Sequence, residues 1–299
     1  MVEPGRYFYR CFSDSSAGGL VSGKGRSAQR LSKQALRVEF KNHLQLDATV
    51  PTALVSVSSR IIDTLRRAFN KLYEDKESPN QIWIAFVHVP DSDKNVYHHA
   101  ENLAEQCGYK ECRRLKYEYV FTWEIPREYF MHKVSIQTLM ERGLNMEDYL
   151  WDRALPATRT LQEEVARKLF DPSNCGYDIG LGLGFLARCF GARAPTRQIA
   201  RQLLQDCLRV LDIDDDAQIV RVSYRDYDAL LDFSYICDIE DGIDMALLDW
   251  WFTEPGFLDA YEEHCASASQ IQEEMEREWD YWREAAMNDG SYSDSDIEM

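Results

Sequence analysis

The sequence predicts an α+β first part followed by a helical, acidic second part. Its 299 residues are 45% apolar and 12% aromatic, which is typical of a globular chain. Residues 1–140 contain short runs rich in aromatic and β-branched residues, whereas the apolar residues beyond them recur at helical spacing. The charge divides at the same place, with a net +4 over residues 1–140 and a net −21 over residues 141–299. We therefore expect two domains, at 1–140 and 141–287, and a disordered acidic tail at 288–299.

Four runs in the first part are expected to form strands, at residues 7–12, 51–59, 82–90 and 116–126. The run 82–90 is continuously apolar, which indicates a buried strand. The run 116–126 ends at Pro126, because proline donates no hydrogen bond to a ladder. A helix is expected after the second run, since its apolar residues share one stripe: Ile61, Ile62, Leu65, Phe69 and Leu72.

The second part is expected to be all-α. Residues 199–211 form a strongly amphipathic pattern that predicts a helix, and another helical stripe lies within residues 269–286. The acidic run 212–216 is similar to a calcium loop, but Ala217 and Ser223 replace its glycine and glutamate, so a solvated turn is expected. Small residues at helical spacing favour close helix packing over a nucleotide-binding loop: Gly180, Gly184, Ala187 and Gly191.

Composition narrows the functional classes. The first residues contain no apolar signal-peptide core, and nowhere do 18 apolar residues run together, so no membrane association is expected. The eight cysteines include no CxxC pair and no histidines at zinc spacing, which favours reduced thiols in the cytoplasm or nucleus and predicts no metal site. The acidic second part is a poor candidate for binding nucleic acid, and it could instead dock a protein partner.

Four polar residues in the first part are candidates for chemistry. Arg10 lies among aromatic residues of the first expected strand, where a strand can hold a guanidinium for phosphate binding. Ser56 and Ser58 share one face of the second strand, just before a helix that they could merely cap. Glu118 enters a hydrophobic strand directly after the basic loop 110–116. Each residue alone also fits an ordinary surface or capping role.

The chain contains, in this order, an arginine after an aromatic residue, a Ser-x-Ser strand leading into a helix, an apolar strand and a glutamate seven residues before Ile-Pro. Together these four features resemble a known pattern. It is that of the cholera-toxin-like and heat-labile-enterotoxin-like mono-ADP-ribosyltransferases, a domain that uncharacterised fungal proteins also carry. The resemblance covers roughly residues 5–134. It implies a split, mixed β-sandwich with flanking helices and NAD bound in a cleft.

The resemblance also implies roles for individual residues. Arg10 would match the NAD-binding arginine, Ser56 and Ser58 the first and last serines of the motif, and Glu118 the catalytic glutamate. Two positions depart from the pattern. Val57 replaces the central threonine, and Lys116 stands where active members have glutamate or glutamine. We expect Lys116 to project on the same face as Glu118 and to disfavour arginine as an acceptor.

The expected activity is therefore NAD-dependent ADP-ribosyl transfer or NAD hydrolysis, with NAD as substrate and no metal. Breaking the bond between nicotinamide and ribose develops oxocarbenium character, which an ionised carboxylate such as Glu118 stabilises. Arg114, Lys116 and Tyr117 would recognise the acceptor, an acidic protein or a nucleic acid, although a charged loop is also common without a ligand. The alternative is a catalytically silent member of the fold that serves as a protein-interaction module.

Overall fold

The computed structural model describes residues 5–45, 50–144, 161–162, 165, 174–207, 209–214, 219–224 and 227–251. Contacts divide the chain into two compact units, residues 1–248 and 249–299, and almost all described residues belong to the first. The expected domain boundary at residue 140 falls inside that first unit. The helix expected within residues 269–286 and the tail expected at 288–299 lie outside the described residues.

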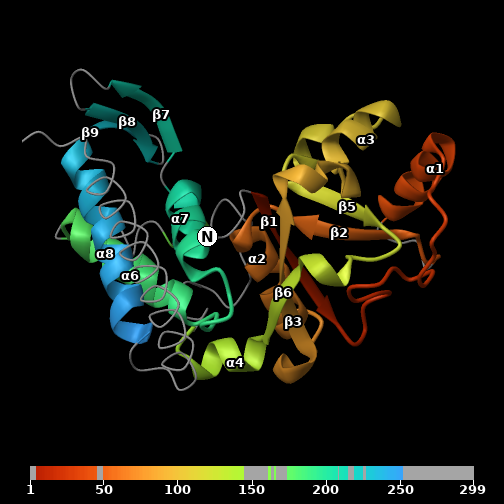
Figure 1. Cartoon of the computed structure of the whole chain (residues 1–299), viewed down its shortest axis with the longest axis horizontal. Coiled ribbons are helices and arrows are strands. Elements are labelled where there is room, and N and C mark those ends of the chain that lie inside the picture. The colour runs from red at the N-terminus through yellow and green to blue at the C-terminus, as the bar shows by residue number, and fades with distance from the viewer. Residues whose placement is uncertain are drawn as a thin grey trace, which may run out of the picture. The chain divides into compact units, whose positions relative to one another are not determined.

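The first part of the chain is α+β, as predicted (Figure 1). Its helices are α1 (Lys33–His43), α2 (Ile61–Tyr73), α3 (Ala100–Gln106) and α4 (Ile136–Glu141). Its strands are β1 (Gly5–Ser13), β2 (Leu54–Ser58), β3 (Ile82–Pro90), β4 (Tyr97–His99), β5 (Glu118–Thr122) and β6 (Phe130–Ser135). Short 3-10 helices precede β3, β4, β5 and β6, at η1 (Pro79–Gln81), η2 (Asp91–Val96), η3 (Cys112–Leu115) and η4 (Arg127–Tyr129).

The six strands form one sheet in the order β4-β5-β2-β1-β3-β6. Every neighbouring pair is antiparallel, so the expectation of a mixed sheet is wrong for these strands. β1 and β3 pair along their whole length, whereas β1 and β2 pair at a single position, Tyr9 with Ser58. The sheet therefore opens between two of its central strands.

Both faces of the sheet are covered by apolar side chains. The stripe of α2, which includes Ile61, Leu65 and Phe69, packs against Tyr9 and the β3 residues, and this confirms the helix that the sequence predicts. α1 and α3 cover the β2–β5 half, where they enclose Leu54 and Val120 (Figure 1). The opposite face holds a second layer of buried side chains: Phe8, Val55, Val57, Val87, Val89 and Phe121.

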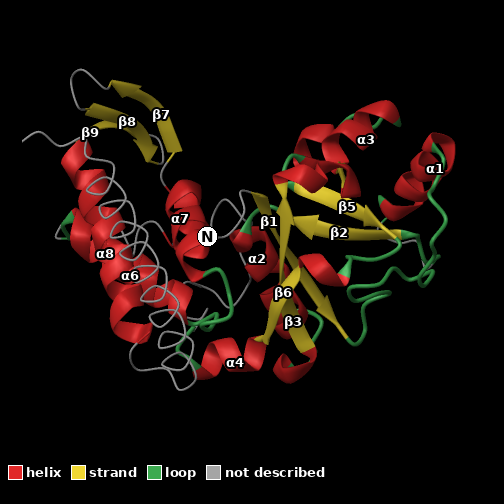
Figure 2. Cartoon of the chain, viewed as in Figure 1, coloured by secondary structure: helices red, strands yellow, loops and turns green. Residues whose placement is uncertain are grey.

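A long loop, residues 14–32, connects β1 to α1 (Figure 2). It is fixed to the segment after β5, because the Ser22 N–H donates to the Trp123 carbonyl at 2.6 Å and the Ile125 N–H donates to the Leu20 carbonyl at 2.8 Å. The Trp123 indole N–H also donates to the Gln29 carbonyl at 2.7 Å. Trp123 has a φ of 67°, a conformation that residues other than glycine rarely adopt. These hydrogen bonds hold the loop against the segment after β5, although a composition rich in Ser and Gly predicts a flexible segment.

The second part contains α6 (Gly176–Arg188), α7 (Thr196–Cys207) and α8 (Phe233–Trp251). The predicted close helix packing is confirmed at Gly180 and Gly184. A Cβ at Gly180 would collide with the Ile239 carbonyl oxygen, and one at Gly184 would lie 2.5 Å from the Ala246 Cβ. Gly242 of α8 makes the reciprocal approach to the backbone of α6. The two helices therefore touch backbone to backbone.

The second part is not all-α. A three-stranded antiparallel sheet follows α7 and precedes α8 in the chain (Figure 2). Its strands are β7 (Arg209–Asp214), β8 (Ile219–Tyr224) and β9 (Tyr227–Asp232). The helix predicted for residues 199–211 ends at Cys207, because the β-branched residues that follow favour extended backbone. The first residues of the expected acidic turn, 212–214, belong to β7.

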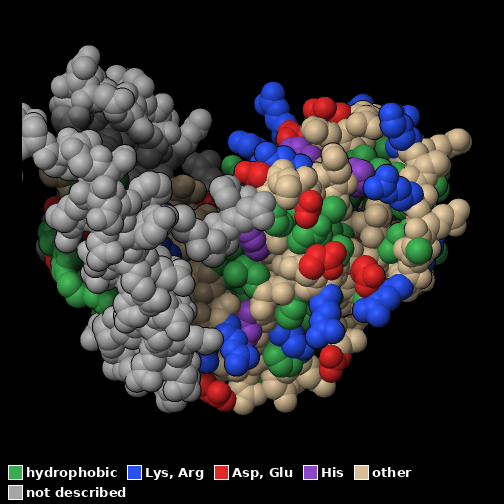
Figure 3. Space-filling model, viewed as in Figure 1, with side chains coloured by type: hydrophobic (Ala, Val, Ile, Leu, Met, Phe, Trp, Pro, Cys, Tyr) green, Lys and Arg blue, Asp and Glu red, His purple; other side chains and the backbone are tan. Residues whose placement is uncertain are grey.

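One hydrophobic cluster joins the two parts. It runs from Tyr9, α2 and β3 through α4 to α6, α7 and α8. At its margin the Arg60 Nε donates to Asp206 Oδ1 of α7 at 2.7 Å. Among the described residues, no helix is both long and apolar enough to cross a bilayer. Basic and acidic side chains intermingle over the described face of the first part (Figure 3).

Candidate functional site

The sheet brings residues from three distant stretches of the chain next to one another. The register pairs Tyr9 of β1 with Ser58 of β2, and Ser58 with Glu118 of β5. Side chains directly opposite each other in antiparallel strands lie on the same face. Ser56, two residues before Ser58, shares that face. The expected site residues thus lie on three adjacent strands, beside the opening between β1 and β2.

Arg10 bridges this opening. Its Nη1 donates to the Ser56 carbonyl at 2.5 Å and lies 3.4 Å from the Ser56 hydroxyl. Its Nε and Nη2 donate to the carbonyl oxygens of Gly19, at 2.6 Å, and Gly18, at 2.8 Å. The guanidinium therefore replaces the ladder that β1 and β2 do not form, and it also holds the loop 14–32. The structure brings Arg10 and Ser56 into contact, and these hydrogen-bond partners of Arg10 are all oxygens of neutral groups.

A pocket of about 160 Å³ opens beside Arg10. The polar residues of its lining come from β1, the loop after it, the end of α1 and the segments that follow α1 and precede β2: Arg10, Ser16, Ser22, Asn42, His43, Gln45 and Thr52. Ligand pockets of proteins typically measure about 300–1,000 Å³. This pocket therefore fits a phosphate or one sugar, and a dinucleotide would extend beyond it. Ser56, Ser58 and Glu118 do not line it.

Ser58 has a structural role. It is buried, and its hydroxyl accepts a hydrogen bond from the Arg60 N–H at 3.1 Å, immediately before α2. That N–H has no partner within the helix, so the hydroxyl satisfies it. Ser56 is only partly buried and lies next to the Arg10 guanidinium. Of the two serines, Ser56 is the one placed to reach a ligand.

Glu118 is ion-paired. Its Oε1 accepts from Nη2 of Arg67, which projects from α2, and the two side chains are 25% and 45% exposed. Sequence reasoning missed Arg67. The available signal is its position at the border of the apolar stripe of α2, on the helix that directly follows the Ser-x-Ser strand. A helix packed beside a strand brings its border residues over the neighbouring strands.

Positive charge gathers around the pocket. Burial, with a smaller contribution from the charge of Arg67, lowers the pKa of Arg10 to about 10. Burial also lowers the pKa of His43, and the charges of Arg10 and Arg67 lower it further. The His43 Nδ1 lies 2.9 Å from the Thr52 hydroxyl. At neutral pH the pocket is therefore lined by one cation, Arg10, and by a neutral imidazole, while the charge of Arg67 acts from outside the lining, and this environment suits an anion.

The expectation that Lys116 lies on the same strand as Glu118 is wrong. β5 begins at Glu118, and Lys116 lies in the turn after η3 with helical dihedral angles, so strand alternation does not place it beside Glu118. Its ammonium lies 5.2 Å from the ring centroid of Tyr117, whose other cationic neighbour is Arg60 at 4.4 Å. Arg114 is exposed and pairs with Glu111 one turn earlier. The structure places these residues at the surface just before Glu118.

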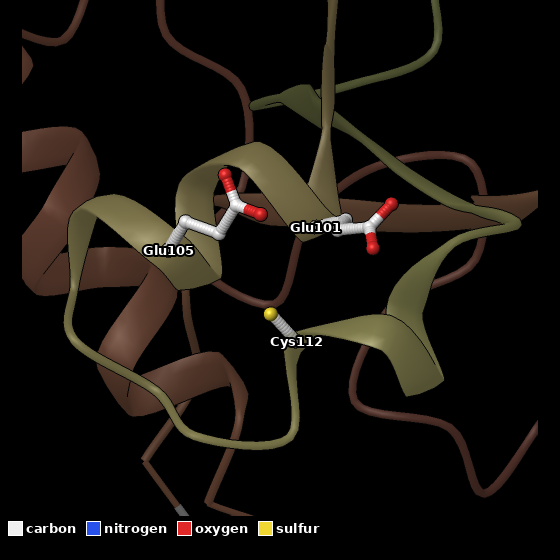
Figure 4. A group of neighbouring side chains, drawn as sticks. All are labelled: Glu101, Glu105 and Cys112. Atoms are coloured by element: carbon white, nitrogen blue, oxygen red, sulfur yellow. The ribbon is translucent and has the colours of Figure 1, made fainter.

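A group of possible metal ligands lies near α3. Figure 4 shows Glu101 and Glu105 on this helix and Cys112 on the adjacent segment, and their ligand atoms lie within 4.8 Å of one another. Glu105 is exposed, and the other two side chains are partly buried. Exposed carboxylates commonly gather without an ion, and a metal-binding group needs further convergent ligands. We assign no metal to it.

Residues 3–139 match a family described as a "Domain of unknown function (DUF7587)". No curated protein and no solved structure matches the chain. The matched stretch contains the entire six-stranded sheet, together with Arg10, Ser56, Arg67 and Glu118. The candidate site therefore lies within the stretch that this family model matches.

Proposed function

We propose that the first part of the chain binds NAD and cleaves its bond between nicotinamide and ribose, with transfer of ADP-ribose or hydrolysis as the outcome. The observation that carries this proposal is that the Arg10 guanidinium contacts Ser56, and that Glu118 lies on the next strand, β5, on the face of the sheet that Ser56 shares. These residues lie up to 108 positions apart in the sequence. They are also the residues of the arginine, Ser-x-Ser and glutamate pattern.

Each side chain would have a distinct task. Arg10 and the pocket beside it would receive a phosphate of NAD, because a guanidinium binds phosphate oxygens with charge-assisted hydrogen bonds. The Ser56 hydroxyl would position the ribose or Glu118. The Glu118 carboxylate would stabilise the positive charge that develops on the ribose as nicotinamide leaves. No step of this scheme needs a metal.

The acceptor proposed from the sequence remains an acidic protein, a nucleic acid or water. Lys116, Arg113 and Arg114 lie at the exposed surface before Glu118, together with Tyr109 and Tyr117. These cations would repel an incoming arginine side chain and attract an anionic acceptor. The positive charge of the whole turn, rather than the direction in which Lys116 points, supports this choice of acceptor.

A second candidate is a silent member of the fold that binds a protein. It is favoured by the engagement of the site residues with their own chain: Arg67 neutralises Glu118, and backbone carbonyls occupy Arg10. A protein of this kind would have no requirement for NAD. The two candidates therefore differ in a direct measurement.

The test is calorimetry with NAD, followed by an assay of nicotinamide release. We expect binding by the full chain, and we expect Glu118→Gln to retain binding but lose release, because the amide keeps the shape and removes the charge. Glu128→Gln, the same change at an exposed position in η4, should behave as the parent. Release at the parent rate from Glu118→Gln would overturn the role of Glu118, and absence of NAD binding by the parent would favour the silent module.

A further inference from the structure

The ion pair between Arg67 and Glu118 joins the candidate reacting carboxylate to the cationic pocket. Arg67 reaches Glu118 from α2, and its charge also lowers the pKa of Arg10 and His43. Arg67 thus pairs with the carboxylate on β5 and is close enough to the two pocket residues for its charge to act on them. Both members of the pair are partly exposed, so a ligand in the opening of the sheet could reach them.

A ligand can replace Glu118 as the partner of Arg67 in this ion pair. Exposed ion pairs contribute little to stability, because water screens them and their long side chains lose conformational freedom. A phosphate group offers a guanidinium two oxygens in a matching plane, whereas the contact with Glu118 involves a single Nη2 and a single Oε1. A multiply charged phosphate ligand would therefore compete with Glu118 for Arg67.

We propose that Arg67 is a ligand-exchanged residue, which pairs with Glu118 in the free protein and transfers to the pyrophosphate of a bound dinucleotide. Arg67 neutralises Glu118 while the site is free, and ligand binding releases the carboxylate. The carboxylate is thereby available to a developing positive charge only when the phosphates are in place. This inference deepens the proposed function and rests on it for the identity of the dinucleotide.

The exchange predicts a thermodynamic coupling that can be measured without cleavage. If Glu118 competes with the ligand for Arg67, then Glu118→Gln should tighten the binding of inorganic pyrophosphate about two- to fivefold, the strength typical of an exposed pair. The same substitution in an Arg67→Gln background should produce a clearly smaller change, because no competition remains. Arg67→Gln alone should weaken pyrophosphate binding more than Arg37→Gln, an equal loss of charge at an exposed position of α1.

The experiment is calorimetric titration of the full-length parent, the two single variants, the double variant and Arg37→Gln with pyrophosphate. Circular dichroism melting would show that each variant is folded. Arg67→Lys gives a second variant that keeps the charge but loses the planar fork, and its affinity should fall between those of the parent and Arg67→Gln. Equal effects of Glu118→Gln in both backgrounds, or equal affinities of Arg67→Gln and Arg37→Gln, would overturn the exchange.

Nicotinamide release from the same proteins separates this inference from the proposed function. If the effect of Glu118→Gln on pyrophosphate binding depends on Arg67 but the parent releases no nicotinamide, ligand exchange at Arg67 is supported and NAD cleavage is contradicted. Release without coupling would support cleavage and contradict the exchange. If both hold, Arg67→Gln should also raise the KM for NAD, because one phosphate contact is lost.

Discussion

Arg10 acts as a connector at the point where two strands separate. Its guanidinium contacts β2 through Ser56 and the loop 14–32 through Gly18 and Gly19. A lysine cannot reproduce this fork, since its single ammonium cannot reach carbonyls that lie in different directions. Arg10 is thus expected to contribute to stability as well as to any phosphate binding.

We expect Arg10→Lys to lower the free energy of unfolding by about 1–3 kcal/mol, because buried carbonyls lose charged donors. Urea denaturation would measure this change. Arg37→Lys, at an exposed position of α1, should alter the value by less than about 0.5 kcal/mol. Equal stability of the parent and Arg10→Lys would show that other groups hold the opening.

Glu77 fixes the start of the same loop. Its Oε1 accepts from Ser15 Oγ at 2.7 Å and from Lys71 Nζ at 2.9 Å. Burial raises its pKa, but the hydrogen bonds from Ser13, Ser15 and Lys71 together outweigh burial and lower the pKa to about 2. The carboxylate thus stabilises the folded state above its unfolded pKa of 4.5, and this contribution is lost as the pH falls from 4.5 towards 2.

Glu77→Gln should therefore lower the free energy of unfolding at pH 7 by about 1–3 kcal/mol and reduce its loss between pH 4.5 and pH 2. Urea unfolding at a series of pH values would measure both effects. Glu128→Gln, an exposed glutamate of η4, provides the matched control. A Glu77→Gln variant with the same pH dependence as the parent would contradict the assignment.

At the level of elements, α6 and α8 illustrate packing that depends on the absence of side chains. A methyl group at Gly180 would overlap the Ile239 carbonyl oxygen and would lie 2.9 Å from the Gly242 Cα, so the helices would have to separate. Backbone atoms cannot rotate away as a flexible side chain can. The cost should therefore resemble that of overpacking a core.

We expect Gly180→Ala to destabilise the protein by about 1–3 kcal/mol, although alanine is the better helix former. The matched control is Gly19→Ala, where the added methyl meets only the Phe12 ring at 3.4 Å. This control should be close to neutral. Thermal melting of both variants would decide, and an unchanged or raised melting temperature for Gly180→Ala would show that the helices can move apart.

The elements that the sequence predicts are those whose local residue pattern is sufficient to identify them. β1, β3 and α2 lie where periodicity and apolar runs place them, as do α6 and most of α7. β4 was missed, because its three residues become a strand only through pairing with β5. β7 was missed because the amphipathic helical pattern of residues 199–211 continues past Cys207, and β8 and β9 were missed because the whole second part was expected to be all-α.

The same distinction applies to the site. Arg10, Ser56 and Glu118 could be selected from their order along the chain, since each lies on or beside a recognisable strand. Arg67 and His43 could not, because their proximity to the pocket follows from how α1 and α2 pack on the sheet. The wrong strand position expected of Lys116 has a similar cause: β5 starts two residues later than its composition suggests.

At the scale of the whole molecule, Asp206 joins α7 to the sheet-bearing part. It pairs with Arg60, and its second oxygen is buried without a hydrogen-bond partner, as is the Tyr9 hydroxyl. Burial raises the pKa of Asp206 to about 6, an effect that Arg60 opposes and Asp63 reinforces. Because the folded pKa exceeds the unfolded value of 3.8, this group stabilises the fold at low pH, and that contribution is lost as the pH rises through about 6.

Asp206→Asn should therefore remove a pH-dependent contribution on the order of 3 kcal/mol between about pH 4 and pH 6, as a shift of about two pKa units implies. The difference in unfolding free energy between parent and variant, measured by urea at several pH values, isolates it from other groups. Asp241→Asn, at an exposed position of α8, is the control. A difference that does not vary with pH would contradict the raised pKa.

The order of the six strands has a consequence for the way the chain is made. β1 precedes the other five strands in the chain, yet it lies in the interior of the sheet, between β2 and β3. Its only extensive partner, β3, begins about 70 residues later, and the edge strand β6 ends at Ser135. During synthesis the β1 segment, with its apolar Phe8 and Tyr9, stays without this ladder until β3 has been made. For that time its apolar side chains are exposed to contact with other chains, so this is the interval in which aggregation competes with folding of the sheet.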